Sequence, residues 1–127
     1  MGKTPIITHS KRQTMVESST YGAEFNAART ATEDSIEIRY MLRSLGVMVD
    51  KPTKLYGNNK AVYYSIAAKE GLCKKRHTSI AFHKLREAAA ARIIRPYHVS
   101  SGENTSNFLT KALGYDKHNK ATNHLLK

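Results

Sequence analysis

The side chains that could perform chemistry are few, and their spacing excludes most reaction classes. The chain has six histidines and one cysteine, Cys73. The pairs His77/His83 and His118/His124 are each six residues apart, which does not place two ligands on one helix face, so we expect no zinc site. No HExxH, GxxxxGK[ST] or GxGxxG motif occurs, and no serine or cysteine lies in a nucleophile motif. We therefore expect no metal site and no cofactor.

Basic side chains are the most abundant groups that could bind a ligand. Lys and Arg number 21 against 10 Asp and Glu, which gives a formal net charge of +11 on 127 residues. Such a field attracts polyanions, and neutralising phosphates releases condensed counterions. We predict contact with nucleic acid, with structured RNA as the expected partner; a surface charged only for solubility is the alternative. The residues predicted to make these contacts are Lys11, Arg12, Lys60, Lys74, Lys75, Arg76, His77, Lys84, Arg86 and Lys111.

Aromatic side chains lie among these basic residues. Tyr56, Tyr63, Tyr64 and Tyr97 could stack on bases, and packing in the core would explain them equally well. Both interpretations stay open at this point.

Apolar spacing predicts the elements that position these groups. We expect strands at 4–8, 54–57 and 93–100, and helices at 21–45, 59–68 and 77–92, with two more helices beginning near 104 and 116. Gly46 is a natural stop for the long helix, and Pro96 favours an edge strand. The buried stripe of the long helix is predicted as Glu24, Ala28, Ala31, Ser35, Ile38, Leu42 and Leu45. The order of strands and helices predicts an α/β domain.

Four stretches of the sequence resemble one known family. They are SKRQ at 10–13 with SSTYGAEF at 18–25, YGNNKAV at 56–62, KKRHTSIAFHKLRE at 74–87 and VSSGENTSNFLTKAL at 99–113. They resemble the ribonuclease H domain of copia-type retrotransposon polyproteins, in particular the protist and algal branch. The second stretch, for example, is similar to the family pattern YCDNxAV.

The resemblance implies which residues would be catalytic. Family members hold two Mg²⁺ ions on four carboxylates and cut the RNA strand of an RNA–DNA hybrid. Here Glu24 matches the helix carboxylate, whereas Asn58 and Asn107 stand where the family has aspartates. The first aspartate belongs to a strand that would precede residue 4. We therefore expect a catalytically inactive pseudo-ribonuclease H with no catalytic residues.

The resemblance also implies a fold with an open sheet. We expect a ribonuclease H-like α/β fold that lacks its first two strands, with a mixed sheet flanked by helices, over residues 1–113. A basic helix or tail follows at 114–127. The middle strand would then expose unpaired backbone groups and one apolar face. Other protein chains are expected to complete or cover this sheet.

These observations predict an inactive, nucleic-acid-binding structural subunit of a larger assembly, such as an organellar ribosome or another ribonucleoprotein. Alternatives are a scaffold subunit of a complex without RNA, half of a Mg-dependent ribonuclease H completed by another chain, and a decayed element fragment without function. No apolar run reaches the ~18 residues of a membrane span, and no signal peptide is expected. We expect an intracellular, non-secreted protein, with an organellar matrix such as that of the mitochondrion as one candidate compartment.

Overall fold

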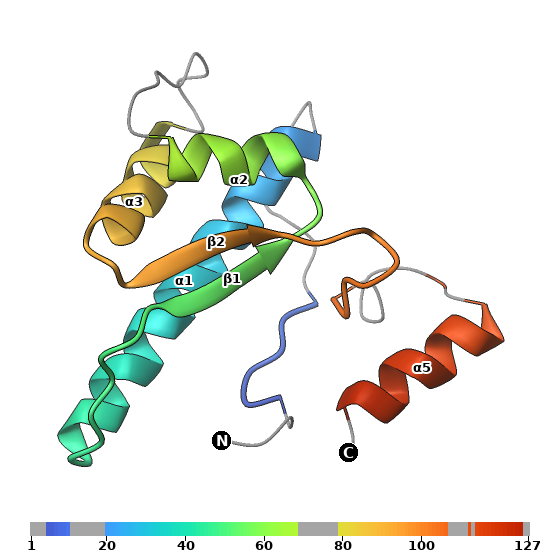
Figure 1. The fold of residues 1–127 in the computed structure, drawn as a ribbon, viewed down its shortest axis with the longest axis horizontal. Coiled ribbons are helices and arrows are strands. Elements are labelled where there is room, and N and C mark those ends of the chain that lie inside the picture. The colour runs from blue at the N-terminus through green and yellow to red at the C-terminus, as the bar shows by residue number, and fades with distance from the viewer. Residues whose placement is uncertain (1–4, 11–19, 69–78, 107–111, 113, 126–127) are drawn as a thin grey trace.

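The computed structural model describes residues 5–10, 20–68, 79–106, 112 and 114–125. Within them the chain forms α1 (Thr20–Ser44), β1 (Thr53–Gly57), α2 (Lys60–Ala67), α3 (Ser79–Ala90), β2 (Ile94–His98) and α5 (Tyr115–Leu125), as Figure 1 shows. The α/β class, both strands, and the positions of α1, α2, α3 and α5 agree with the sequence prediction to within a few residues. Gly46, at φ 78°, ends the turn after α1 as expected.

The two strands form a parallel sheet. The register runs from the pair Thr53 and Ile94 to the pair Gly57 and His98. Helices α2 and α3 provide the crossover that parallel strands require. Within the described residues β2 pairs only with β1, so Pro96 lies in an edge strand as predicted. The expected mixed sheet is wrong for the described part of the chain, because its only two strands run parallel.

The segment 5–10 does not form the strand predicted at 4–8. Ile6 and Ile7 are 57% and 46% exposed, and no described residue pairs with their backbone as a strand. Instead His9 Nε2 donates to Asp34 Oδ2 at 2.8 Å and holds the segment beside α1. A β-branched run becomes a strand only where its backbone finds a pairing partner, and this one lies against a helix.

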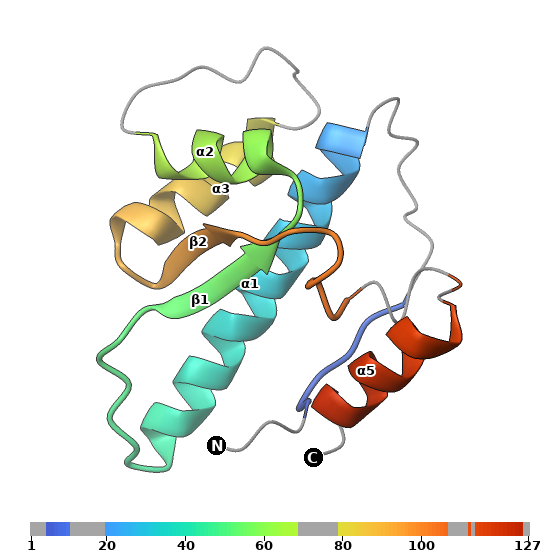
Figure 2. The same cartoon turned by 45° about the vertical axis from the view of Figure 1, so that its right-hand side comes forward.

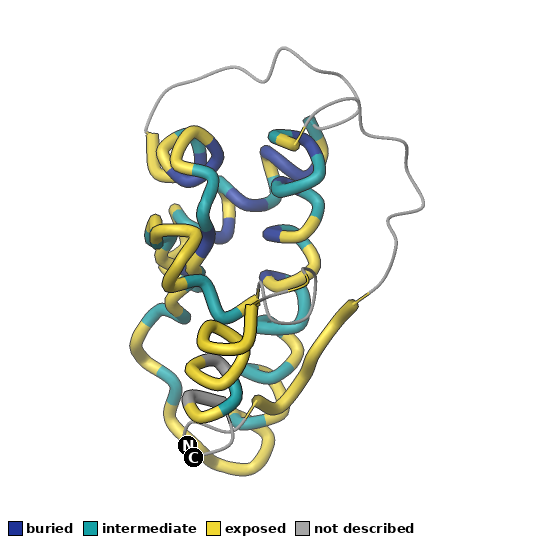
Figure 3. Tube along the Cα trace, turned by 90° about the vertical axis from the view of Figure 1, so that its right-hand side faces the viewer, coloured by how far each residue is buried: buried dark blue, intermediate teal, exposed yellow. Residues whose placement is uncertain are grey.

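The core lies between the sheet and the three helices α1, α2 and α3. Phe25 and Leu85 are fully buried, and they pack with Val62, Phe82 and Ile94. The rings of Phe25 and Phe82 lie 5.8 Å apart and join α1 to α3. Figure 3 shows that the buried positions gather at the end of the molecule where these helices meet. Ala81, Ala88 and Ala89 complete the stripe of α3 largely as predicted, with Ala89 only half-buried.

Helix α1 presents a different face from the predicted one. Its buried residues are Gly22, Phe25, Ala28 and Thr32, whereas Ala31 and Leu45 of the predicted stripe are exposed. Glu24 is half-buried. The face is set by the large ring of Phe25, because the many small side chains of this helix provide little contrast in hydrophobicity. The second half of α1 extends beyond the sheet (Figure 2).

The C-terminal region differs in one respect from the prediction. Residues 104–106 form a turn and not the start of a helix. The rest of that predicted helix lies outside the described residues. Helix α5 carries exposed Lys117 and Lys120. No helix in the part of the chain described here is long and apolar enough to span a membrane.

Candidate functional site

A hollow of about 440 Å³ lies where the first turns of α1 meet the carboxyl end of β1. Its lining consists of Thr20, Glu24, Asn58, Asn59, Lys60 and Ala61. Glu24 and Asn58 are the two described positions that match metal-binding carboxylates of the resembling family. Although they are 34 positions apart in the sequence, the fold brings both to the same hollow.

The turn from β1 into α2 positions the two asparagines. Asn59 is the N-cap of α2, and its side-chain oxygen accepts from the Val62 N–H at 3.5 Å. Asn58 Nδ2 donates to Ser101 Oγ at 3.4 Å, in the loop that follows β2. The Val99 N–H donates to the Gly57 carbonyl at 2.8 Å, which extends the strand pairing to this loop. The Asn58 amide therefore connects the ends of the two strands.

Tyr63 closes the space behind the strand end. Its side chain is buried, and its hydroxyl donates to the Tyr56 carbonyl at 3.4 Å. Burial, and then the nearby negative charge of Glu24, raise the pKa of Tyr63 well above its usual value, so the phenol stays neutral. The ring packs so closely on Gly57 that a Cβ atom there would overlap its Oη, Cζ and Cε2 atoms.

The donor set of the hollow does not fit two Mg²⁺ ions. It contains one carboxylate, two neutral amides, one hydroxyl and the Lys60 ammonium. Mg²⁺ sites in phosphoryl-transfer enzymes rely on carboxylates to offset the ionic charge, and a cation in the same hollow opposes metal binding. Within the described ranges no three His, Cys, Asp or Glu side chains are grouped to hold a metal ion. Asn107 lies outside the described residues.

Three of the ten residues predicted to contact nucleic acid are described. Lys60 is exposed, lines the hollow and places its Nζ 5.6 Å from the centre of the Tyr64 ring. Lys84 Nζ donates to Glu33 Oε1 at 2.5 Å, which ties α3 to α1. Arg86 donates to the Ala68 carbonyl at 2.8 Å. The other seven lie outside the described residues: Lys11, Arg12, Lys74, Lys75, Arg76, His77 and Lys111. Nucleic-acid contact by all ten stays a prediction.

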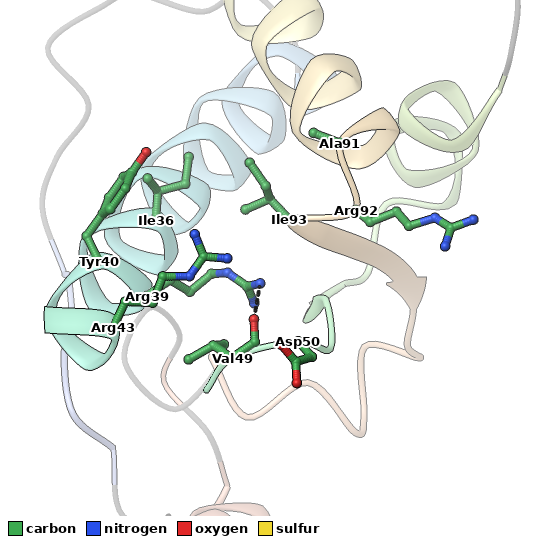
Figure 4. A pocket seen from close by; sticks show the side chains of 9 residues that line it. All are labelled: Ile36, Arg39, Tyr40, Arg43, Val49, Asp50, Ala91, Arg92 and Ile93. Carbon is green, nitrogen blue, oxygen red and sulfur yellow. Dashed lines mark hydrogen bonds between the residues drawn. The ribbon is translucent and has the colours of Figure 1, made fainter. Parts of the chain in front are cut away.

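A second pocket, of about 290 Å³, lies at the opposite end of the sheet and was not predicted. Figure 4 shows the guanidinium groups of Arg39 and Arg43, from successive turns of α1, pointing toward Val49 and Ile93. Arg39 donates to the Val49 and Lys51 carbonyls at 3.1 and 2.8 Å. Arg39 thus fixes the loop that leads into β1. The i, i+4 spacing of the two arginines is the sequence signal that could have indicated their shared face.

Comparison with known proteins finds similarity to transposon polyproteins. The chain is 27% identical over 113 residues to the retrovirus-related Pol polyprotein from transposon RE1 of Arabidopsis thaliana, and 26% identical over 113 residues to that from transposon RE2 of the same plant. Each alignment covers 89% of this chain and 8% of the relative's length, so the chain spans a small part of the proteins it matches. No family model and no solved structure matches. The similarity supports a retrotransposon-derived domain.

Proposed function

We propose that this chain is a catalytically inactive ribonuclease H-like domain that binds nucleic acid, chiefly RNA, as a structural subunit of a larger assembly. The observation that carries the proposal is the meeting of Glu24 and Asn58 in one hollow. These residues match two catalytic positions of the resembling family, and a shared hollow is what a common origin of that site requires. The similarity to Pol polyproteins supports the same origin. The protist and algal branch stays a prediction.

The composition of the hollow supports loss of hydrolysis. A two-metal mechanism needs enough negative charge to hold two divalent ions beside a phosphate. Asn58 can offer a carbonyl oxygen but no charge, and Lys60 adds a positive charge at the rim.

Net charge supports nucleic acid as the ligand. An excess of +11 on 127 residues is large for a chain with a small core, and several of the cations are exposed on described elements. A ribonucleoprotein such as an organellar ribosome is the setting that we propose. There a polycation without catalytic function would neutralise the charge of packed RNA.

An exposed apolar surface supports a protein neighbour as well. Around the C-terminal end of α1 lie Tyr40, Met41, Leu45, Val47 and Met48, which are between 47% and 82% exposed. Contiguous exposed apolar side chains mark protein contacts more often than free surface. This surface also favours the second candidate function, a scaffold subunit of a complex that contains no RNA.

Binding and cleavage assays test the proposal. We expect the purified chain to bind single- or double-stranded RNA with an affinity that falls steeply as salt rises, since each neutralised phosphate contributes to the slope. We expect no cleavage of an RNA–DNA hybrid with Mg²⁺ by the wild type or by Asn58→Asp. Cleavage of the hybrid by the wild type that is abolished by Glu24→Gln would refute the proposal that the domain is catalytically inactive.

Sedimentation from the native source separates the two candidate functions. Release of the chain from a large particle by nuclease supports the RNA-bound subunit. A chain that stays in a large complex after nuclease treatment, and that binds no RNA when purified, supports the scaffold.

A further inference from the structure

Among the helices that the structure describes, none packs against one of the two faces of the strands. Helices α1, α2 and α3 cover the inner face, where Leu55 and Ile94 point into the core. The opposite face carries the alternate residues, and the parallel register sets Lys54 beside Arg95 and Tyr56 beside Tyr97. We call these four side chains the outer sheet face. In Figure 1 both strands lie in front of α1, so this face is turned toward the viewer.

The outer sheet face is aromatic and basic, whereas the sequence predicted an exposed apolar face. The rings of Tyr56 and Tyr97 lie 5.6 Å apart with 33° between their planes. The guanidinium of Arg95 lies 5.4 Å from the centre of the Tyr97 ring. Tyr56 is 53% exposed, and Lys54 and Arg95 are exposed as well. One exposed ring, that of Tyr56, and one half-buried ring, that of Tyr97, are thus flanked by two cations.

This combination fits single-stranded nucleic acid. Proteins that bind single strands stack bases on aromatic side chains and attract the phosphates with Lys and Arg. In a duplex the bases stack on one another and their faces are not available to a tyrosine ring. We propose that the outer sheet face binds single-stranded RNA, with bases on Tyr56 and Tyr97 and phosphates at Lys54 and Arg95. This inference rests on the proposed nucleic-acid function.

Other occupants fit the face less well. A protein strand that extends the sheet would pair with the edge of β1 and leave the outer face open. A protein surface packed over the face would bury Lys54 and Arg95, which is costly unless acidic partners are supplied. Helix α5 of this chain is itself cationic, with exposed Lys117 and Lys120, and like charges oppose its docking there.

The test measures the affinity of the full chain for a labelled oligouridylate by fluorescence anisotropy. Removing a stacked ring costs about 1–3 kcal/mol per base, so Tyr56→Leu and Tyr97→Leu are each expected to weaken binding about fivefold to 150-fold. Leucine retains apolar volume on the strand and removes the aromatic face. Tyr56→Phe retains the ring and is expected to bind like the wild type. Tyr40→Leu is the matched control, because Tyr40 is 67% exposed on α1 and is not part of the outer sheet face.

A second measurement needs no label. The chain contains no tryptophan, so its emission comes from tyrosine. Binding of oligouridylate is expected to quench this emission, and Tyr56→Leu and Tyr97→Leu are expected to reduce the quenching. Circular dichroism of each variant checks that the fold is retained.

The outcomes separate this inference from the proposed function. If the wild type binds RNA and the Tyr56 and Tyr97 variants bind as tightly as Tyr40→Leu, the outer sheet face is not the binding surface, and the proposed function still stands. Preference for duplex RNA over the single strand would likewise overturn the inference. If the wild type binds no RNA at low salt, the proposed function fails. Burial of this face against a co-purifying protein would assign it to a protein partner.

Discussion

The contact between Gly57 and Tyr63 leads to the sharpest prediction about this fold. In the resembling family's pattern YCDNxAV the position of Gly57 is a cysteine. Here a Cβ atom at that position would overlap the phenol oxygen and two ring carbons of Tyr63. Tyr63 cannot move aside easily, because it is buried in α2 between the buried residues Val62 and Ile66. We therefore expect Gly57→Ala to force a shift of α2 against the strand.

The expected cost follows from overpacking. Added methylene groups in a well-packed core typically cost about 1–3 kcal/mol, and the overlap with three atoms places Gly57→Ala in the upper part of that range, at about 2–3 kcal/mol. Gly57→Cys adds a larger atom and is expected to cost at least as much. Urea unfolding followed by far-UV circular dichroism measures both changes in the free energy of unfolding.

A double-mutant cycle tests the stated cause. Tyr63→Leu removes the three ring atoms that a Cβ at residue 57 would meet. It is destabilising by itself, because a buried ring and its hydrogen bond to the Tyr56 carbonyl are lost. In the Tyr63→Leu background Gly57→Ala should cost less than in the wild type, and the difference should exceed the roughly 0.5 kcal/mol within which independent changes add. A Gly57→Ala cost that is unchanged in that background, or a cost near zero in the wild type, would refute the reasoning.

Three further changes test other contacts. Glu33→Gln should lower the free energy of unfolding at pH 7 by about 0.5 kcal/mol, after allowance for solvent screening, because hydrogen bonds from Lys84 and then Arg29 hold the pKa of Glu33 below 4.5. The pKa of Glu33 is lower in the folded than in the unfolded state. The extra free energy of unfolding of the wild type over Glu33→Gln should therefore be fully present above pH 4.5 and be lost as the pH falls through the folded-state pKa. Urea unfolding over a pH series measures this loss. Arg39→Lys should lower the free energy of unfolding in urea by about 1–2 kcal/mol, because a single ammonium group cannot replace the guanidinium that donates to the Val49 and Lys51 carbonyls. Equal stability of the variant and the wild type would contradict this. Asn59→Ala should cost about 1 kcal/mol in the same assay through loss of the α2 N-cap, and no change would show that the cap is dispensable.

The elements that sequence predicted well are those with large apolar side chains at regular spacing. In α3, Phe82 and Leu85 define the buried stripe without ambiguity. In α1 the length was predicted to within one residue at each end, but the buried face was not. Alanine, serine and threonine occupy nine of the 25 positions of that helix, so its orientation depends on Phe25 and on the contact of Phe25 with Phe82, a residue far away in the chain.

The residues of the candidate sites were likewise predicted only in part from the sequence. Glu24 and Asn58 were predicted through a motif, and the structure places them together. The Arg39 and Arg43 pocket was missed, because five of its lining residues come from the loop before β1 and from the turn between α3 and β2. The pairing of Tyr56 with Tyr97 depends on strand register, which the spacing of residues within one strand does not encode. A motif thus singled out Glu24 and Asn58, which line one hollow, and tertiary structure was needed for the rest.

The parallel pairing of β1 with β2 has a consequence for how the domain opens. Every hydrogen bond of the sheet joins residues about 41 positions apart, as in the pair Thr53 and Ile94, and the helices α2 and α3 lie between them in the chain. The strands cannot separate without disturbing these helices or the core beneath them, so contacts of this kind form slowly and open only with the domain as a whole. Amide hydrogen exchange should therefore be slowest at the strand amides that donate across the β1–β2 pair, such as that of Thr53 to the Ile93 carbonyl, and fast along α5, whose described side chains lie mostly in solvent.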